Sequence, residues 1–252
     1  MLLVLAACAL APAALRATPM VYGVEFVTNG NAGVVDLANG SFNVVGQVGP
    51  YLINDIAFSP AYVLYGIRDT SELVRIDPST GQVTDVMAVP SGLETLDFRP
   101  SDGVLFAATS SALFTINLST DTTTLVGSYG LSFQGQNIRF DQYGNLYTTD
   151  TSSTTGVYLV NTSTGAAALE FTVPFGALAL GYAGGNLYGV GIAGIGGQNN
   201  LILINPTTQT GTLVLNSFPS VDFSEIPEPG VAWLCGLGLA VLLLRSRLKL
   251  LS

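Results

Sequence analysis

The sequence predicts an all-β fold, a β-propeller of five four-stranded blades that is closed by a C-terminal strand and followed by a C-terminal transmembrane helix. Three observations lead to this fold class. A repeat of about 40 residues runs through the chain, one aromatic residue recurs in every repeat and is left over at the end, and an uncharged apolar run precedes a basic C-terminus. A period of 40 to 45 residues built from short strands is typical of propeller blades, with a β-solenoid or a β-sandwich as the alternative.

The repeat is marked most clearly by a polar turn that follows an apolar strand. The sequence Leu-Val-Arg-Ile-Asp-Pro-Ser-Thr-Gly recurs in related forms at residues 73–81, 113–120, 157–165 and 201–208, and a degenerate copy ends at Asp36. The Asp or Asn that opens each turn stands at positions 36, 77, 117, 161 and 205. Because such side chains accept hydrogen bonds from the backbone that follows, each turn is expected to join two consecutive strands.

Two aromatic series identify the first two strands of each blade. The series expected on second strands is Tyr22, Tyr65, Phe106, Tyr147 and Tyr188. The series expected on first strands is Phe58, Phe98, Phe140, Tyr182 and Phe223. The first unit therefore lacks a first strand, while Phe223 has no blade after it. We expect residues 220–223 to supply the innermost strand of the first blade, which closes the ring and leaves no open sheet edge at the seam.

The body of the chain is strongly acidic. Between residues 17 and 229 it carries four arginines, no lysine and 17 acidic residues, which gives a net charge of −13. A surface of this sign repels phosphate backbones, so no nucleic-acid partner is expected. About 210 residues suffice for one large domain.

The residue types present exclude most familiar catalytic sites. The chain has no histidine, and its two cysteines, Cys8 and Cys235, lie in the end segments. Ser-His-Asp and Cys-His catalysis, histidine-ligated zinc and a disulfide framework in the body are thereby excluded. Residues 189–194 match G-x-G-x-x-G, but no helical pattern follows, so we expect a glycine-rich loop between two strands and no dinucleotide site.

One group of polar residues on the first strands is a candidate site. Its members, which alternate with apolar residues, are Asp55, Asp97, Arg139 and Asp222. Alternation with period two places them on the face toward the central channel, where equivalent positions of the blades converge. One interpretation is structural, with these groups bonding loop backbones and Arg139 offsetting buried carboxylate charge. The other is a site for a cation or small polar ligand, and calcium is the cofactor that suits its oxygen donors.

Residues 225–252 have the composition of a membrane-directed sorting segment. In order along the chain they contain Pro227, Glu228 and Pro229, an uncharged run at 230–244, and the basic residues Arg245, Arg247 and Lys249. An apolar run without charges partitions into lipid, whereas terminal cations stay on the cytoplasmic side. We expect a transmembrane helix at residues 231–248. Its uninterrupted apolar core, residues 231–244, has 14 residues and is short against the roughly 20 that span a bilayer.

The order of these parts resembles the PEP-CTERM sorting signal of exported bacterial proteins. The resemblance covers residues 227–252 only. It implies recognition and cleavage near Pro227, Glu228 and Pro229 by an exosortase-type processing enzyme. The basic residues Arg245, Arg247 and Lys249 are expected to retain the helix in the membrane until then. An ordinary single-pass anchor is the alternative.

Residues 1–17 are expected to form a cleaved signal peptide, because they combine an apolar stretch with small residues that suit signal peptidase. The stretch lacks a basic beginning. Residues 5–8, Leu-Ala-Ala-Cys, also resemble a lipoprotein cleavage box, which is the less favoured alternative. The body, residues 18–224, is thus expected to be exported through the cytoplasmic membrane, anchored by the C-terminal helix before processing, and afterwards located at the cell surface or outside the cell.

The expected function is a non-enzymatic one. The propeller would act as a binding or structural module at the surface or in the extracellular matrix, with a polysaccharide or protein ligand. Residues 96–100 and 103–106 are similar to uncharacterised exported bacterial propeller proteins, a resemblance that implies no activity. The alternative is a lactonase-like hydrolase that uses a carboxylate-bound metal, and it depends on Asp55, Asp97 and Asp222 forming one open cluster.

Overall fold

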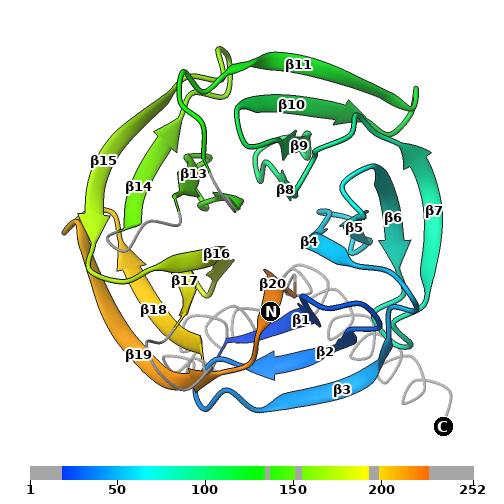
Figure 1. The fold of residues 1–252 in the computed structure, drawn as a ribbon, viewed down its shortest axis with the longest axis horizontal. Coiled ribbons are helices and arrows are strands. Elements are labelled where there is room, and N and C mark those ends of the chain that lie inside the picture. Colours follow the sequence, from blue (N-terminus) through cyan, green and yellow to red (C-terminus); the bar gives the residue numbers. More distant parts are fainter. Residues whose placement is uncertain (1–18, 134–136, 151–154, 193–198, 227–252) are drawn as a thin grey trace, which may run out of the picture.

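The chain folds into a β-propeller of five four-stranded antiparallel blades arranged around a central axis (Figure 1). The computed structural model describes residues 19–133, 137–150, 155–192 and 199–226, and within these ranges the regular secondary structure consists of strands only. The predicted fold of the body is therefore confirmed. No helix in the described ranges is long and apolar enough to span a membrane. The segments 1–18 and 227–252, with the helix expected at 231–248, lie outside the described residues.

Blades 2 to 5 are each formed by four consecutive strands, the first of which lies innermost. Blade 2 contains β4 (Ile53–Phe58), β5 (Leu64–Arg68), β6 (Glu72–Ile76) and β7 (Val83–Ala88). Blade 3 contains β8 (Thr95–Phe98), β9 (Leu105–Ala108), β10 (Ala112–Asn117) and β11 (Thr122–Ser128). Blade 4 contains β12 (Ile138–Phe140), β13 (Leu146–Thr149), β14 (Thr155–Val160) and β15 (Ala167–Val173). Blade 5 contains β16 (Ala177–Ala183), β17 (Asn186–Ile192), β18 (Asn199–Asn205) and β19 (Thr210–Phe218).

Blade 1 joins the two ends of the body, as the leftover aromatic residue predicts. Its strands are β20 (Val221–Glu225), β1 (Met20–Glu25), β2 (Asn31–Asp36) and β3 (Phe42–Gln47), in this order from the channel outward. β20 pairs with β1 in antiparallel register, with Val221 opposite Glu25 and Glu225 opposite Val21. The closing strand thus extends two residues beyond the expected 220–223, and its inner position seals the edge that β1 would otherwise expose.

The turn between the third and fourth strands has the same chemistry in every blade. The side chain of its opening residue accepts the backbone N–H two residues later at 2.8–2.9 Å in all five cases. These opening residues are Asp36, Asp77, Asn117, Asn161 and Asn205. The spacing seen in the sequence therefore follows from one repeated Asx turn.

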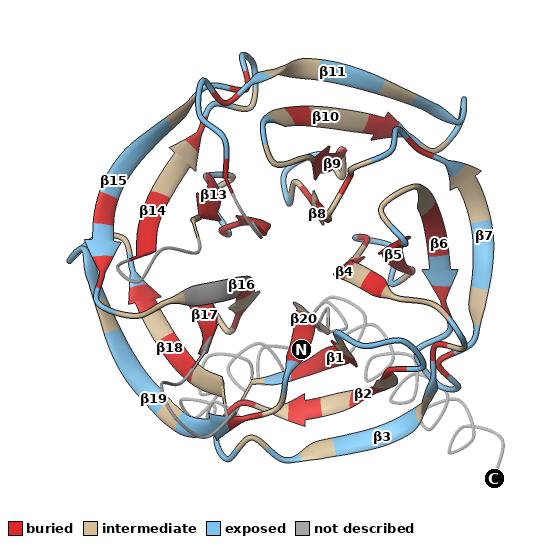
Figure 2. Cartoon of the chain, viewed as in Figure 1, coloured by how far each residue is buried: buried red, intermediate tan, exposed pale blue. Residues whose placement is uncertain are grey.

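The apolar core lies between the blades. Five clusters of buried side chains occupy the five interfaces between neighbouring blades. The two aromatic series meet there: ring centroids lie 6.1 Å apart for Tyr22 and Phe58, and 5.3 Å apart for Phe106 and Phe140. Figure 2 shows the consequence, because buried residues gather on the inner strands while the outermost strands are mainly exposed. Each blade is therefore stabilised by its neighbours, and closure completes the last interface.

The expected glycine-rich loop at 189–194 is wrong for its first four residues. Gly189 to Ile192 belong to β17, where Gly189 pairs with Leu180 of β16 and Ile202 of β18. Two neighbouring strands use the backbone hydrogen-bonding groups of this segment, so strand pairing overrides the local flexibility of glycine.

Candidate functional site

Each inner strand has one edge that faces the channel and pairs with no further strand. On the inner strands β4, β8 and β12, side chains from the preceding blade accept hydrogen bonds from N–H groups on this edge. Between blades 1 and 2, the Ile56 N–H donates to Asp222 Oδ2 at 3.1 Å and the Phe58 N–H donates to Ser224 Oγ at 3.0 Å. The polar positions of β20 therefore hold β4 against blade 1.

The same arrangement continues in blades 3 and 4. Asp55 Oδ2 of β4 accepts the Leu96 N–H of β8 at 2.8 Å. Thr95 Oγ1 of β8 accepts the Ile138 N–H at 2.9 Å, and Asp97 Oδ2 accepts the Phe140 N–H at 2.7 Å, both on β12. The alternating polar residues thus link the inner strands of blades 1 to 4 across the channel-facing edges.

Arg139 of β12 lies at the centre of this cluster, with only 2% of its surface exposed. Its guanidinium forms a two-pronged ion pair with Asp55, with Nη1 at 2.9 Å from Oδ2. Nη2 also lies 3.3 Å from Asp222 Oδ1. The remaining bonds go to backbone carbonyl oxygens of Leu96, Ile138, Ile56 and Phe223. One side chain therefore joins the inner strands of four blades.

The burial of these charges separates the pKa values of the two aspartates. Burial alone would raise the pKa of Asp55, but the charge of Arg139 and the hydrogen bonds that the Asp55 carboxylate forms hold that pKa below its usual value. Burial, together with the negative charge of Asp55, raises the pKa of Asp222 well above its usual value. Asp55 is therefore the ionised partner of Arg139, and the environment of Asp222 favours its protonated form.

Asp97 occupies a third electrostatic setting beside the cluster. Burial raises its pKa to about 6, although the charge of Arg139 acts in the opposite direction. Both of its oxygens already accept backbone N–H groups, from Phe98 at 2.9 Å and Phe140 at 2.7 Å. Its carboxyl group therefore links β8 to β12 by a hydrogen bond.

The donor set does not fit the calcium ion that the sequence suggested. The oxygens of Asp55 are occupied by the guanidinium, by backbone N–H groups and by the Thr95 hydroxyl. Arg139 supplies the positive charge in the place where a cation would have to bind. In the described ranges no group of three or more acidic or metal-binding side chains could hold a metal ion. The four predicted residues do lie together. Their contacts match the structural interpretation, in which the aspartates bond backbone groups and Arg139 offsets carboxylate charge.

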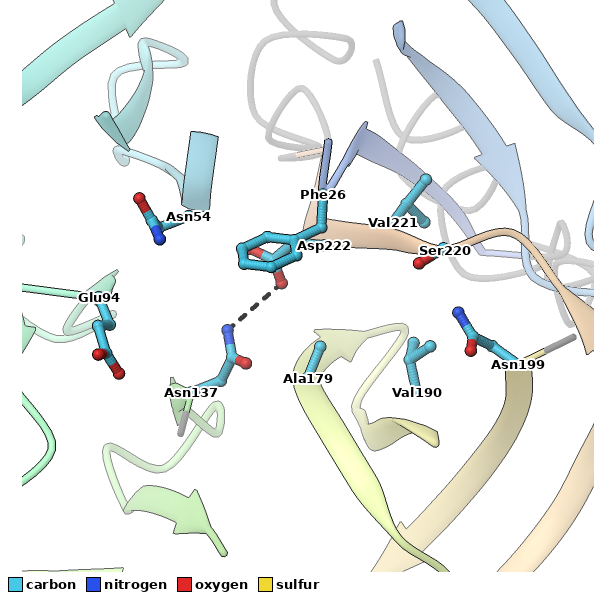
Figure 3. Close-up of a pocket in the computed structure, with 10 residues that line it drawn as sticks. All are labelled: Phe26, Asn54, Glu94, Asn137, Ala179, Val190, Asn199, Ser220, Val221 and Asp222. Carbon is cyan, nitrogen blue, oxygen red and sulfur yellow. Dashed lines mark hydrogen bonds between the residues drawn. The ribbon is translucent and has the colours of Figure 1, made fainter. Parts of the chain in front are cut away.

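A cavity lies at each end of the inner strands. The first, of about 290 Å³, lies at the beginnings of the inner strands and is shown in Figure 3. Its lining comprises Phe26, Asn54, Glu94, Asn137, Ala179, Val190, Asn199, Ser220, Val221 and Asp222. The second, of about 260 Å³, lies at the ends of the same strands, where Asp97, Arg139 and Glu225 contribute to the wall. The two cavities differ chemically, because none of the described residues that line the first is basic, whereas Arg139 lines the second.

Phe26, Asn54 and Glu94 were not predicted as site residues. A signal for two of them exists, because Asn54 and Glu94 each stand four residues before the first-strand aromatic of their repeat. Phe26 follows β1 and has no counterpart in that series. The predicted sorting residues, Pro227 to Pro229 and the basic tail, lie outside the described residues.

Comparison with known proteins supports the fold. No protein-family model matches the chain, and no curated protein is similar to it in sequence. TolB from Acinetobacter baumannii is 14% identical and matches 84% of this chain and 55% of its own, with a TM-score of 0.54. A protein of unknown function from Bacteroides thetaiotaomicron is 15% identical and matches 68% and 53%, with a TM-score of 0.52. The chain spans about half the length of these structures, and at such low identity the similarity shows the propeller fold alone.

Proposed function

We propose that the chain is an exported, exosortase-sorted protein of the cell surface or extracellular matrix, whose propeller is a non-enzymatic binding module. The order of signal peptide, acidic propeller and PEP-CTERM-like segment in the sequence supports the location. The closed ring of five blades supports the role of a rigid scaffold that presents its channel mouths and loops to a polysaccharide or protein.

The observation that best supports the binding role is that the charged groups at the channel centre are already paired. Its aspartates and its arginine are committed to one another and to the backbones of neighbouring blades. A general acid or base must instead reach a substrate proton, and a catalytic metal needs an open coordination position. The arrangement stabilises the ring and leaves the cavities at the mouths as the accessible concave surfaces.

The hydrolase alternative loses its support in this geometry. It required an open cluster of Asp55, Asp97 and Asp222, whereas Asp55 and Asp222 both pair with Arg139. Both oxygens of Asp97 already accept backbone N–H groups, one on β8 and one on β12.

A sedimentation assay distinguishes binding from turnover. The purified full chain is mixed with surface polysaccharide from the producing bacterium, and the pellet and the length of the polysaccharide are measured with and without a metal chelator. We expect the protein to sediment with the polysaccharide, whose length stays constant in both conditions. Shortening of the polysaccharide that stops in the presence of the chelator would contradict the proposal and restore the metal-dependent hydrolase.

A further inference from the structure

We propose that the 290 Å³ cavity binds one or two neutral pyranose rings of a polysaccharide. This inference rests on the proposed function and names the ligand class of the binding module. Ligand pockets in proteins begin at roughly 300 Å³ and combine an apolar surface with a few fixed polar groups, which are the features found here.

The apolar part of the cavity consists of one aromatic ring and three aliphatic side chains. Phe26 is 51% exposed, and Figure 3 shows its ring pointing into the cavity toward the side of Asn54 and Asn137. Ala179, Val190 and Val221 also line the cavity. A pyranose presents a face of C–H groups, which packs against an aromatic ring and small aliphatic groups without loss of its hydroxyl hydrogen bonds.

The backbone at Phe26 is held by hydrogen bonds. The Phe26 N–H donates to the Ser220 carbonyl oxygen at 3.3 Å, and the next N–H, from Val27, donates to the Glu25 carbonyl oxygen at 2.8 Å. An exposed phenyl ring on a fixed backbone gives a ligand a stacking surface that loses little conformational entropy on binding.

The polar part of the cavity is dominated by amides, which match hydroxyl groups. Asn54 Oδ1 accepts the Thr70 N–H at 3.2 Å, which orients its amide nitrogen away from that bond. Asn137 Nδ2 donates to Asp222 Oδ1 at 3.4 Å, which leaves its carbonyl oxygen for a ligand. Asn199 adds a third amide. A sugar hydroxyl both donates and accepts, so it pairs with either side of such an amide.

The charges around the cavity select a neutral sugar. None of the described residues that line it is a lysine or arginine, and residues 17–229 carry a net charge of −13, so uronic acids and other anions are repelled. The Asp222 carboxyl group already accepts hydrogen bonds from Arg139 and from the Ile56 N–H. Glu94 is the remaining carboxyl group among the described lining residues; burial raises its pKa, and its oxygens can accept hydrogen bonds from sugar hydroxyls.

Saturation-transfer NMR and calorimetry with tetrasaccharides test this inference on the full chain in detergent micelles. The neutral probes are maltotetraose, cellotetraose, mannotetraose and galactotetraose, and the charged ones are tetragalacturonate and glucosamine tetramer. We expect binding of at least one neutral probe and of neither charged one. Phe26→Ala should weaken that binding at least tenfold, whereas Phe26→Trp should retain it. The matched control is Tyr143→Ala, because Tyr143 is 81% exposed and lies outside the cavity lining.

The outcomes separate this inference from the proposed function. Absence of neutral-probe binding, or unchanged affinity in Phe26→Ala, overturns the sugar site even if the protein is sorted and sediments with polysaccharide. Preferential binding of the glucosamine tetramer that disappears in Glu94→Gln also overturns it, because the cavity would then be a cation site. Conversely, sugar binding by a protein that is never exported leaves this inference in place and refutes the proposed location.

Discussion

Replacement of Arg139 by methionine should destabilise the propeller strongly, because it leaves the ionised Asp55 in the channel centre without its counter-charge. Asp55 is 0% and Asp222 is 5% exposed, so neither gains solvation from water when the guanidinium is lost. Removal of one partner from a buried ion pair costs about 3–5 kcal/mol. The loss of the bonds to four backbone carbonyl oxygens acts in the same direction.

The pH dependence of this effect has a definite sign. In the wild type the pKa of Asp55 is depressed, so the pair contributes stability above the ordinary aspartate value of 3.8, and this contribution is lost as the pH falls through the depressed value. Without Arg139, burial raises the pKa of Asp55. The destabilisation by Arg139→Met should therefore be larger at pH 7 than at pH 4.

Urea unfolding of four proteins measures the interaction directly. These are the wild type, Arg139→Met, Asp55→Asn and the double variant, each at pH 4 and pH 7. We expect the double variant to be more stable than Arg139→Met by about 1–3 kcal/mol at pH 7, since it no longer buries an unpaired charge. A loss below about 1 kcal/mol in Arg139→Met, or additive effects in the double variant, would refute the argument.

Three further predictions follow from the same structure. The pKa of Asp97 is about 6 in the folded protein against 3.8 ordinarily. The protonated carboxyl group therefore contributes stability at low pH, and this contribution is lost as the pH rises through 6. At 1.36 kcal/mol per unit of pKa shift, the loss is about 3 kcal/mol. Urea unfolding at pH 4 and pH 7 should show this loss in the wild type and not in Asp97→Asn, and equal pH dependence in both would contradict it. Deletion of residues 219–223 should abolish cooperative melting of blade 1, because it removes most of β20, and an unchanged melting temperature by calorimetry would disprove the closure. Millimolar calcium should leave the melting temperature unchanged because Arg139 occupies the cation position, so a rise in that temperature would reinstate the metal site.

The repeat architecture was predictable because each of its markers has a local physical cause. Asp77 and Asn117 recur because the same Asx turn is needed in each blade. Phe58 and Phe98 recur because each packs against an aromatic ring of the preceding blade. The unmatched Phe223 predicted the closing strand, since a missing and a surplus inner strand are complementary.

The details of the channel depend on contacts between blades, which no single repeat encodes. Strand alternation predicted that Asp55, Arg139 and Asp222 face the axis, but it did not show that one guanidinium joins four inner strands. Phe26 was missed because its role arises from the position of a strand end at the channel mouth. A β-bulge between the third and fourth strands of every blade was missed as well, for example at Leu73 and Val74, because a register shift leaves no distinct residue pattern.

The proposed export and sorting are tested most directly by the intact mass and location of the protein in a host that carries the sorting machinery. The wild type is compared with a variant in which Pro227, Glu228 and Pro229 are replaced by alanines. We expect the wild type to be recovered from the cell surface or the medium after cleavage at both ends. It should lack residues 1–17, and it should also lack the apolar segment and the basic tail. The variant should accumulate in the cytoplasmic membrane with that segment attached. Identical masses that retain the C-terminal segment in both proteins would contradict sorting and leave a permanent membrane anchor.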